Sequence, residues 1–419
     1  MRGVFEPFWV TLRVLWWRNL LRRDGRPALG LLDMIQMLVQ CLTGANRLWL
    51  SRQYMDLAGS EAGLEFARRH VPSRHRPGIW LLQANAAKSD DALWLSSINE
   101  YLACFGTPPI ALEVTEGTRF ERLRPLEERV VEDGPLISVI MAAYNAEAVI
   151  KHAIASVLSQ TWRNLELIIV DDCSTDDTWA LMQAAATLDP RVRLLRNTVN
   201  VGPYVSKNLA LRIAQGKYVT GQDADDWSHP SRLERDMAAL RDSNGGVKAL
   251  ISSMVRLDEN GQFAQFSLRH PVPRAPDGFL KPAPISMLIE TDLLRSTFGG
   301  WDSVRFIADS ELLERMRKIL GRAVFQTDKI GMVCLDSLSS LSNHSEYGVS
   351  KDHGLSPIRR EYQIAFREWH RSMDTSETHM DIMSANRPFP APQAMLVSPK
   401  AIAANARAQD AQIDSLRQL

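Results

Sequence analysis

Between residues 136 and 223, apolar runs of strand length alternate with helical segments, and the loops between them are short. The strand runs are LISVIMA, LELIIV, RVRLLRN and KYVTGQD, and the helical segments are AEAVIKHAIASVLSQT, DDTWALMQAAATL and VSKNLALRIAQG. Alternating strands and helices fold into a parallel sheet covered by helices and joined by right-handed crossovers. The sequence therefore predicts an α/β fold with a mostly parallel, Rossmann-like sheet. It also predicts that Gly216 caps the end of the third helix.

The segments on either side of this alternation have different patterns. Apolar residues recur at helical spacing in LLDMIQMLVQCL and DALWLSSINEYLACF near the N-terminus, and later in ADSELLERMRKIL and REYQIAFREWHRSM. The runs GVKALISSMVRL and GQFAQFSL flank Asp258–Gly261, which predicts a hairpin. From Asn386 the chain is rich in proline and alanine, so we expect a tail that is mobile or docks elsewhere. The expected units are a helical N-terminal domain (1–134), a sheet domain (135–345), a C-terminal helical extension (346–385) and a mobile tail (386–419).

Composition excludes several classes of protein. The 419 residues carry 49 basic and 49 acidic side chains, and this balance argues against nucleic acid as a partner. The four cysteines are far apart and form no C-x-x-C pair, which disfavours a disulfide scaffold or a cysteine zinc site.

Membrane and targeting signals are weak. No run of about 18 apolar residues is present and no signal peptide is visible, so we expect a cytoplasmic protein. The segment FEPFWVTLRVLWWRNLLRR mixes aromatic and arginine residues. It predicts either a helix that docks on its own domain, which we favour, or peripheral contact with a membrane surface.

Polar and acidic residues follow the strands of the predicted sheet. In open α/β sheets, ligands bind at the carboxyl ends of the strands, so these residues are candidates for a binding site. The residues at these strand ends are Ala143, Tyr144 and Asn145 after the first strand, Asp171 and Asp172 after the second, Asn200 and Gly202 after the third, and Asp223, Ala224 and Asp225 after the fourth.

The acidic cluster after the fourth strand is the sharpest feature. In an extended chain Asp223 and Asp225 point to the same side, where two carboxylates suit Mg²⁺ or Mn²⁺. The alternative is an aspartate-rich turn before a helix that starts near Ser231. Asp171 and Asp172 could accept hydrogen bonds from a base or ribose, or cap the next helix. Tyr144 could stack on a base or lie partly buried at the strand end.

Taken together, four motifs resemble an inverting family 2 glycosyltransferase with the GT-A fold. They are SVIMAAYN, VDDCSTDDT, NVGPYVSKNLALRIAQGKYV and DADDWSHPSRLE, and the resemblance covers residues 135–235 closely and continues to about residue 345. It implies a nucleotide-diphosphate sugar donor, foremost a uridine one, and a divalent metal, Mn²⁺ or Mg²⁺. It further implies a saccharide or lipid-linked glycan acceptor and a role in surface polysaccharide biosynthesis, for example of a capsule.

The resemblance also implies roles for particular residues. Tyr144 and Asp172 match base-contacting positions, with Asp171 as the neighbouring candidate, and Ala143, Asn145, Gly202 and Ala224 lie in the donor motifs. Asp223 and Asp225 match the D-x-D motif, in which Asp225 would bind the metal and Asp223 would face the ribose and phosphates. The segment GGWDSVRFIADSELLERM is similar to the family's catalytic segment and makes Asp309 the base. Because Ala308 replaces a frequent glutamate, Asp302 and Glu311 are alternatives.

Three functions fit these patterns unequally. The leading one is an enzyme that transfers a sugar to a hydroxyl by a single displacement with inversion. The alternative is a non-catalytic glycosyltransferase-like protein that binds or scaffolds in polysaccharide assembly. A sugar nucleotidyltransferase ranks last, because AAYNAEAV lacks a glycine-rich basic phosphate loop.

Overall fold

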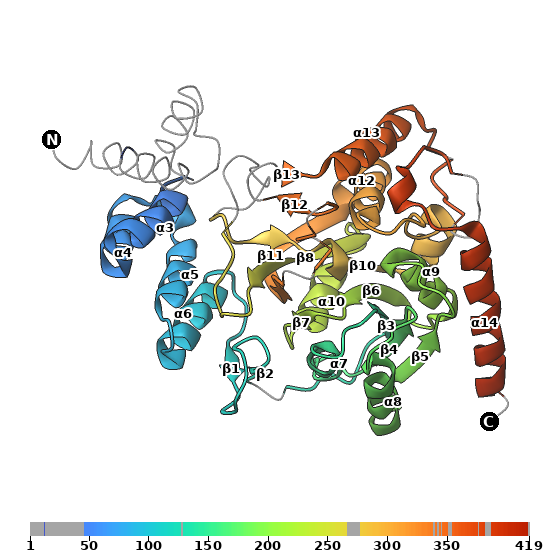
Figure 1. The fold of residues 1–419 in the computed structure, drawn as a ribbon, viewed down its shortest axis with the longest axis horizontal. Coiled ribbons are helices and arrows are strands. Elements are labelled where there is room, and N and C mark those ends of the chain that lie inside the picture. Colours follow the sequence, from blue (N-terminus) through green and yellow to red (C-terminus); the bar gives the residue numbers. More distant parts are fainter. Residues whose placement is uncertain are drawn as a thin grey trace.

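The computed structural model describes residues 46–417 and Leu12, apart from short gaps at 127–128, 266–276, 338–339, 342, 345, 351–353, 376 and 382–386 (Figure 1). The aromatic and arginine-rich segment 5–23 and the apolar run 29–44 lie outside these residues, apart from Leu12. Among the helices described, none has both the length and the apolar character needed to cross a bilayer.

A nine-stranded sheet forms the centre of the molecule, in the order β5-β4-β3-β6-β10-β8-β11-β7 with β9 paired to β8. The four predicted strands are β3 (Ile137–Ala143), β4 (Leu165–Asp171), β5 (Val192–Arg196) and β6 (Tyr218–Asp223), and they are mutually parallel. This confirms the predicted α/β fold with a mostly parallel sheet. β5 is an edge strand.

The later strands extend the sheet with mixed directions. β10 (Leu288–Glu290) is antiparallel to β6 and to β8 (Ala249–Leu257), and β11 (Val324–Leu335) is parallel to β8. The short strands β7 (Asp226–Ser228) and β9 (Lys281–Pro282) pair antiparallel with β11 and β8 respectively. β7 directly follows the acidic loop and fixes its far end to the sheet.

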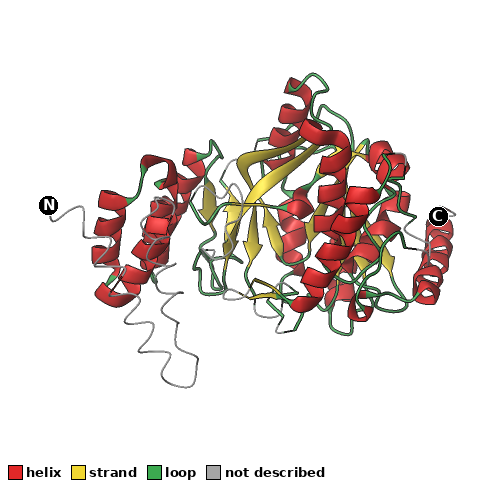
Figure 2. Cartoon of the chain, turned by 90° about the horizontal axis from the view of Figure 1, so that it is seen from above, coloured by secondary structure: helices red, strands yellow, loops and turns green. Residues whose placement is uncertain are grey.

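Helices flank the sheet on both sides (Figure 2). Side chains of a strand alternate between its two faces, so both faces of β3 and β4 present apolar residues. On one side, Ile140 and Ile168 belong to the same hydrophobic cluster as residues of α9 (Pro203–Ile213), α12 (Ala308–Leu320) and α13 (Pro357–Ser372). On the other side, Val139 and Leu167 belong to a second cluster, together with residues of α7 (Ile150–Leu158), α8 (Thr178–Leu188) and α10 (Arg232–Asp242).

The prediction that Gly216 caps the third helix is wrong. The helix ends at Ile213, and Ala214 follows with an extended backbone. The backbone N–H of Gly216 donates instead to Ser138 Oγ at 2.8 Å, and a Cβ at Gly216 would lie 2.4 Å from the Ser138 nitrogen. Glycine is therefore needed for close contact between two chain segments, not for a cap.

The helical N-terminal region shares a core with the sheet. It contains α3 (Asn46–Ala58), α4 (Ser60–His70), α5 (Pro77–Ala86) and α6 (Asp91–Cys104), followed by the hairpin β1 (Ile110–Leu112) and β2 (Leu123–Pro125). Buried Trp94 stacks on Phe263 with ring centroids 5.4 Å apart and donates from Nε1 to Gly261 O at 2.8 Å. The boundary at residue 134 is therefore not a boundary between separate cores.

The hairpin predicted at Asp258–Gly261 is formed only in part, because a residue of the N-terminal helices bonds to its second arm. The turn is present, since Gly261 N donates to Asp258 O at 2.9 Å. Within the described residues, the expected second strand is reduced to a bridge between Leu257 and Phe263. Asn85 Nδ2 donates to Phe263 O at 3.0 Å, and Asn85 Oδ1 accepts from Phe263 N at 2.6 Å. These two bonds to a side chain take the place of strand pairing at Phe263.

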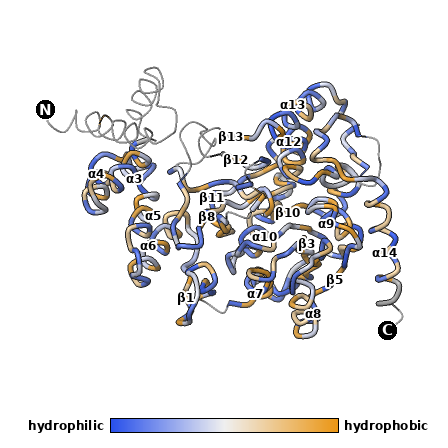
Figure 3. Tube along the Cα trace, viewed as in Figure 1, coloured by the Kyte–Doolittle hydropathy of each residue, from blue (hydrophilic) through white to orange (hydrophobic). Residues whose placement is uncertain are grey.

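The C-terminal parts pack on the sheet domain. The tail at 386–419, which we expected to be mobile or to dock elsewhere, contains α14 (Pro399–Arg417), and this helix lies beside the edge strand β5. Apolar and polar residues alternate along α14 (Figure 3). Ile402 and Ala406 pack against Val205 and Leu209 of α9. The remaining short elements are β12 (Val349–Ser350), β13 (Gly354–Leu355), α11 (Thr291–Leu293), a π-turn at Leu294–Phe298 and 3₁₀ turns at Ser73–His75, Pro284–Ser286, Gly321–Ala323 and Gln393–Met395.

Candidate active site

A cavity of about 1290 Å³ opens at the carboxyl ends of β3, β4 and β6. This is the edge at which open α/β sheets bind ligands. Nine of the ten predicted site residues line it: Ala143, Tyr144, Asn145, Asp172, Gly202, Asp223, Ala224, Asp225 and Asp309. The topology therefore brings together residues that are up to 166 positions apart in sequence (143 to 309).

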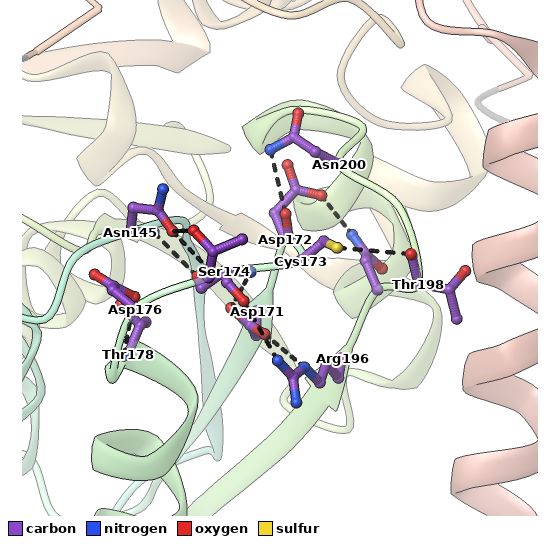
Figure 4. Close-up of polar contacts among 12 residues, drawn as sticks. Asn145, Asp171, Asp172, Cys173, Ser174, Asp176, Thr178, Arg196, Thr198 and Asn200 are labelled. Carbon is purple, nitrogen blue, oxygen red and sulfur yellow. Dashed lines mark hydrogen bonds and ion pairs between the residues drawn. The ribbon is translucent and has the colours of Figure 1, made fainter.

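Asp171 is the predicted site residue that does not line the cavity. Its side chain is fully buried, and Oδ2 lies 2.9 Å from Arg196 Nε (Figure 4). Oδ1 accepts from Ser174 N at 3.1 Å. Asp171 thus holds the turn after β4 in place, and we do not retain it as a ligand-binding residue.

Asp172 organises the loop that precedes α9. Its carboxylate accepts from Asn197 Nδ2 at 2.8 Å, Val201 N at 2.9 Å and Gly202 N at 2.7 Å. Burial raises the pKa of Asp172 although these bonds favour its charged form. Gly202 has φ of +83°, a conformation that side chains disfavour, so glycine suits the sharp turn beside the cavity.

Tyr144 and Asn145 form the wall of the cavity next to β3. Tyr144 is 51% exposed, which leaves its ring free to meet a planar ligand. Asn145 is in the left-handed region with φ of +46°, and its Oδ1 accepts from Thr175 N at 2.9 Å. The side chain of Asn145 therefore bridges the turns that follow β3 and β4.

The acidic loop after β6 contains three carboxylates in different environments. Asp223 pairs with buried Lys207, with 2.7 Å between Oδ1 and Nζ. Burial, and then the charge of Asp223, raise the pKa of half-buried Asp225 to about 6. Asp226 is buried, accepts from Leu335 N at 3.1 Å and has a pKa raised well above its ordinary value, mainly by burial. Asp226 is therefore structural, whereas Asp225 lines the cavity, where burial and neighbouring Asp223 disfavour its charged form.

The donor set at this loop fits a divalent cation completed by a substrate. Among the described residues, no group of three or more histidine, cysteine, aspartate or glutamate side chains forms a metal site. Asp223 and Asp225 offer hard oxygen ligands on the cavity wall, and Mg²⁺ typically binds through one or two carboxylates together with substrate phosphates.

Asp309 lies in the first turn of α12, and its Oδ1 accepts from Ser310 N at 2.8 Å. The preceding Ile307 has φ of +67°, a strained value for a β-branched residue. Buried Tyr204 lies close to both candidate carboxylates: burial, Asp309 and then Asp223 raise the pKa of its phenol well above the ordinary value. The acidic loop and the start of α12 therefore face the same part of the cavity.

The two alternative bases are built into the protein interior. Asp302 is buried, pairs with Arg387 and accepts from Tyr362 Oη at 2.6 Å. Glu311 is fully buried and lies 2.9 Å from both Arg315 Nε and His370 Nε2. Neither residue lines the cavity. Of the three candidates, Asp309 alone is placed to meet a ligand there.

Several basic residues of the cavity were not singled out from the sequence. Lys207 lies inside the motif that carries the resemblance, so that motif could have indicated it. Arg305 donates to Asn200 Oδ1 at 2.7 Å and thereby joins the α12 segment to the loop before α9. Arg359 comes from α13, and burial lowers its pKa while Asp309 and Tyr204 lie close by. No local pattern around Arg359 pointed to the cavity.

Comparison with known proteins finds similarity to one family over part of the chain. Residues 138–282 match the model of glycosyl transferase family 2. A putative glycosyltransferase, EpsE, of Bacillus subtilis is 39% identical over 132 residues, which cover 31% of this chain and 47% of that protein. A β-1,3-glucosyltransferase of Escherichia coli, WfaP, whose name gives UDP-Glc as donor and GlcNAc-diphosphoundecaprenol as acceptor, is 42% identical over 92 residues, 22% of this chain and 36% of that protein.

Solved structures also match part of this chain. A mannosyltransferase of Pyrobaculum calidifontis, in complex with GDP-Man and Mn²⁺, matches 68% of this chain and 78% of that chain at 20% identity, with a TM-score of 0.40. The family model thus matches residues 138–282, about a third of the chain. The match to each of these curated relatives spans less than half of the relative's length.

Proposed function

We propose that this chain is an inverting glycosyltransferase that moves a sugar from a nucleoside diphosphate donor to a hydroxyl of a saccharide or lipid-linked glycan. The observation that carries the proposal is that Asp309, Asp223 and buried Tyr204 line the same cavity. A base and an acidic loop suited to a metal–diphosphate unit thus lie within one cavity, as a displacement at the anomeric carbon requires.

The residues of this chain would divide the work between them. Tyr144 would stack on the base, and the loop held by Asp172 would enclose the nucleoside. Asp309 would take the proton of the acceptor hydroxyl as that oxygen attacks the anomeric carbon, which typically contributes about 10²–10⁴ in rate. The diphosphate leaves from the opposite face, so the product has inverted configuration.

A divalent cation fits the acidic loop, where Asp225 and Asp223 would hold it. When bound, it supplies Lewis-acid stabilisation of the charge that develops on the diphosphate. Lys207, with its ammonium 2.7 Å from Asp223, keeps the position of that carboxylate fixed. The choice of Mn²⁺ or Mg²⁺ stays part of the proposal.

The names of relatives support a role in surface polysaccharide assembly and a uridine donor. One relative, WcaA of Escherichia coli, is described as a putative colanic acid biosynthesis glycosyl transferase, and it is 43% identical over 105 residues, 25% of this chain and 37% of that protein. The non-catalytic alternative is not favoured, since Asp309 lines the cavity and is free of the buried ion pairs that occupy Asp302 and Glu311. A cytoplasmic location and membrane contact through residues 5–23 remain predictions.

A donor screen tests the proposal. The chain is mixed with UDP-, GDP- and dTDP-sugars, with and without Mn²⁺, and the shift in melting temperature and the release of free sugar are measured. We expect metal-dependent stabilisation by one nucleotide class, because a ligand that binds the native state alone raises the apparent stability. Transfer to an acceptor should give the inverted anomer by NMR, and a retained anomer would contradict the mechanism.

A further inference from the structure

The C-terminal helix α14 carries three buried or half-buried amide side chains on one face, Asn405, Gln409 and Gln412. Their spacing of four and three residues aligns them along the helix. All three bind the chain that leaves the edge strand β5, between residues 196 and 199. An edge strand exposes unpaired backbone groups, and α14 satisfies part of them with side-chain amides.

The contacts are bidentate at two of the three positions. Gln412 accepts from Arg196 N at 3.1 Å and donates to Arg196 O at 3.0 Å. Asn405, which is 0% exposed, accepts from Thr198 N at 2.8 Å and donates to Val199 O at 2.9 Å. Side chains of α14 therefore bind the backbone as a neighbouring strand would.

These contacts lead directly to the proposed donor site. Gln409 Nε2 donates to Asn197 Oδ1 at 2.7 Å, and Asn197 Nδ2 donates to Asp172 Oδ1 at 2.8 Å. The same Asp172 carboxylate holds the backbone of Val201 and Gly202 at the cavity wall. Figure 4 shows Thr198 on the side of α14, with Asp172 and Asn200 further from that helix. A continuous chain of hydrogen bonds thus runs from Gln409 to the turn at Gly202.

The segment before α14 makes a second connection. Met395 O accepts from Arg305 N at 3.0 Å, and Leu396 forms a bridge with Val304. Arg305 in turn donates to Asn200 Oδ1. The C-terminal segment 395–412 is therefore bonded both to the loop before α9 and to the segment that leads into Asp309.

We infer that α14 positions the nucleotide-binding loop 197–202, with Asn405 and Gln409 as positioning residues for donor binding. The inference rests on the proposed function, because it takes this cavity as the donor site. When α14 no longer holds the loop 197–202, the donor must order this loop as it binds, and part of its binding free energy is lost. We therefore expect the affinity for the donor to fall while the proton transfer to Asp309 is unaffected.

The test compares Gln409→Met and Asn405→Ala with the unaltered chain and with Arg407→Ala, a change on the exposed face of α14. Gln409→Met is the milder change, because among the described residues Gln409 Oε1 has no hydrogen-bond partner and the bond from Nε2 to Asn197 is the one that is lost. Calorimetric titration with UDP and Mn²⁺ gives Kd, and donor hydrolysis gives KM and kcat. Hydrogen exchange reports the backbone amides of residues 198–202.

We expect Kd and donor KM to rise about tenfold in the two test variants, with kcat within about threefold of the unaltered value. Exchange at 198–202 should accelerate, while exchange in β4 and all properties of Arg407→Ala stay unchanged. A merely structural role would reduce the amount of active protein and leave Kd unchanged. If the unaltered chain binds UDP and both variants bind it equally well, the inference is overturned and the proposed function stands. If the unaltered chain binds no nucleotide, the proposed function itself is overturned.

Discussion

Replacing Asp309 with asparagine separates basicity from geometry at the proposed catalytic position. Asp309 Oδ1 accepts from Ser310 N at 2.8 Å, and an asparagine Oδ1 can accept the same bond. The variant therefore keeps the side chain in place and removes its capacity to take a proton. A lost general base lowers kcat by about 10²–10⁴, equivalent to about 2.7–5.4 kcal/mol of transition-state stabilisation.

The free energy of unfolding and the affinity for UDP should change far less than kcat in the Asp309→Asn variant. A carboxylate in the first turn of a helix contributes about 0.3–1 kcal/mol through the helix dipole, and that is the expected loss in the free energy of unfolding for Asp309→Asn. Since the proposed nucleotide contacts come from other loops, UDP should bind with a Kd within about threefold of the unaltered value. Donor hydrolysis, calorimetric titration with UDP and Mn²⁺, and urea unfolding measure the three quantities.

Glu311→Gln is the matched control, because it makes the same chemical change two residues further along α12. Glu311 is fully buried against Arg315 and His370, so this variant should lose roughly 3 kcal/mol of stability. Its kcat per folded molecule should remain near the unaltered value. The assignment is refuted if Asp309→Asn retains kcat within about threefold, or if Glu311→Gln alone abolishes turnover while remaining folded.

Three further results are expected. Tyr144→Ala should weaken UDP binding about tenfold and Tyr144→Phe should not, because base stacking needs the ring and not the hydroxyl; equal losses in titrations of both variants would contradict stacking. Asp225 has a folded pKa of about 6, above its ordinary 3.8, so the stability linked to its protonation is fully present below 3.8 and is lost as pH rises through about 6. In the metal-free protein, Asp225→Asn should therefore raise the free energy of unfolding at pH 7.5 by up to roughly 3 kcal/mol, and this gain should shrink below pH 6. The same variant should abolish Mn²⁺-enhanced UDP binding. A difference in the free energy of unfolding that does not depend on pH would argue against an unfavourable buried charge at Asp225. Trp94→Ala should cost about 3–5 kcal/mol and leave a single unfolding transition, because Trp94 lies in a core shared with the sheet domain; two separate transitions would show that the helical region folds on its own.

Much of the sheet and of the site was predictable because the signals are local. Each strand from β3 to β6 is an apolar run, and the polar residues at its end are close in sequence to that run. Parallel connectivity then places those ends at one edge, which is why Asp172 and Asp223 could be assigned to one site in advance. Lys207 belongs with them, since it lies within the same motif.

The role of each carboxylate was decided by partners that are distant in sequence. Asp171 and Asp172 are adjacent in sequence. Arg196 nevertheless holds Asp171 in the interior, whereas Asp172 lines the cavity. The choice of Asp309 over Asp302 depends on Arg387, which lies 85 residues beyond Asp302. No local sequence pattern can predict such contacts, because they form only when distant parts of the chain come together in the folded protein.

By itself, the sequence determined the alternation that builds the sheet and the carboxylates at its edge, since hydrophobic period and residue type are properties of short segments. The tertiary structure alone decided that α13 contributes Arg359 to the cavity and that α14 covers the edge strand β5. The positions of α13 and α14 depend on which backbone groups and apolar surfaces remain exposed after the sheet has formed. The C-terminal segments cover the apolar surfaces by long-range packing and satisfy the backbone groups through amide hydrogen bonds.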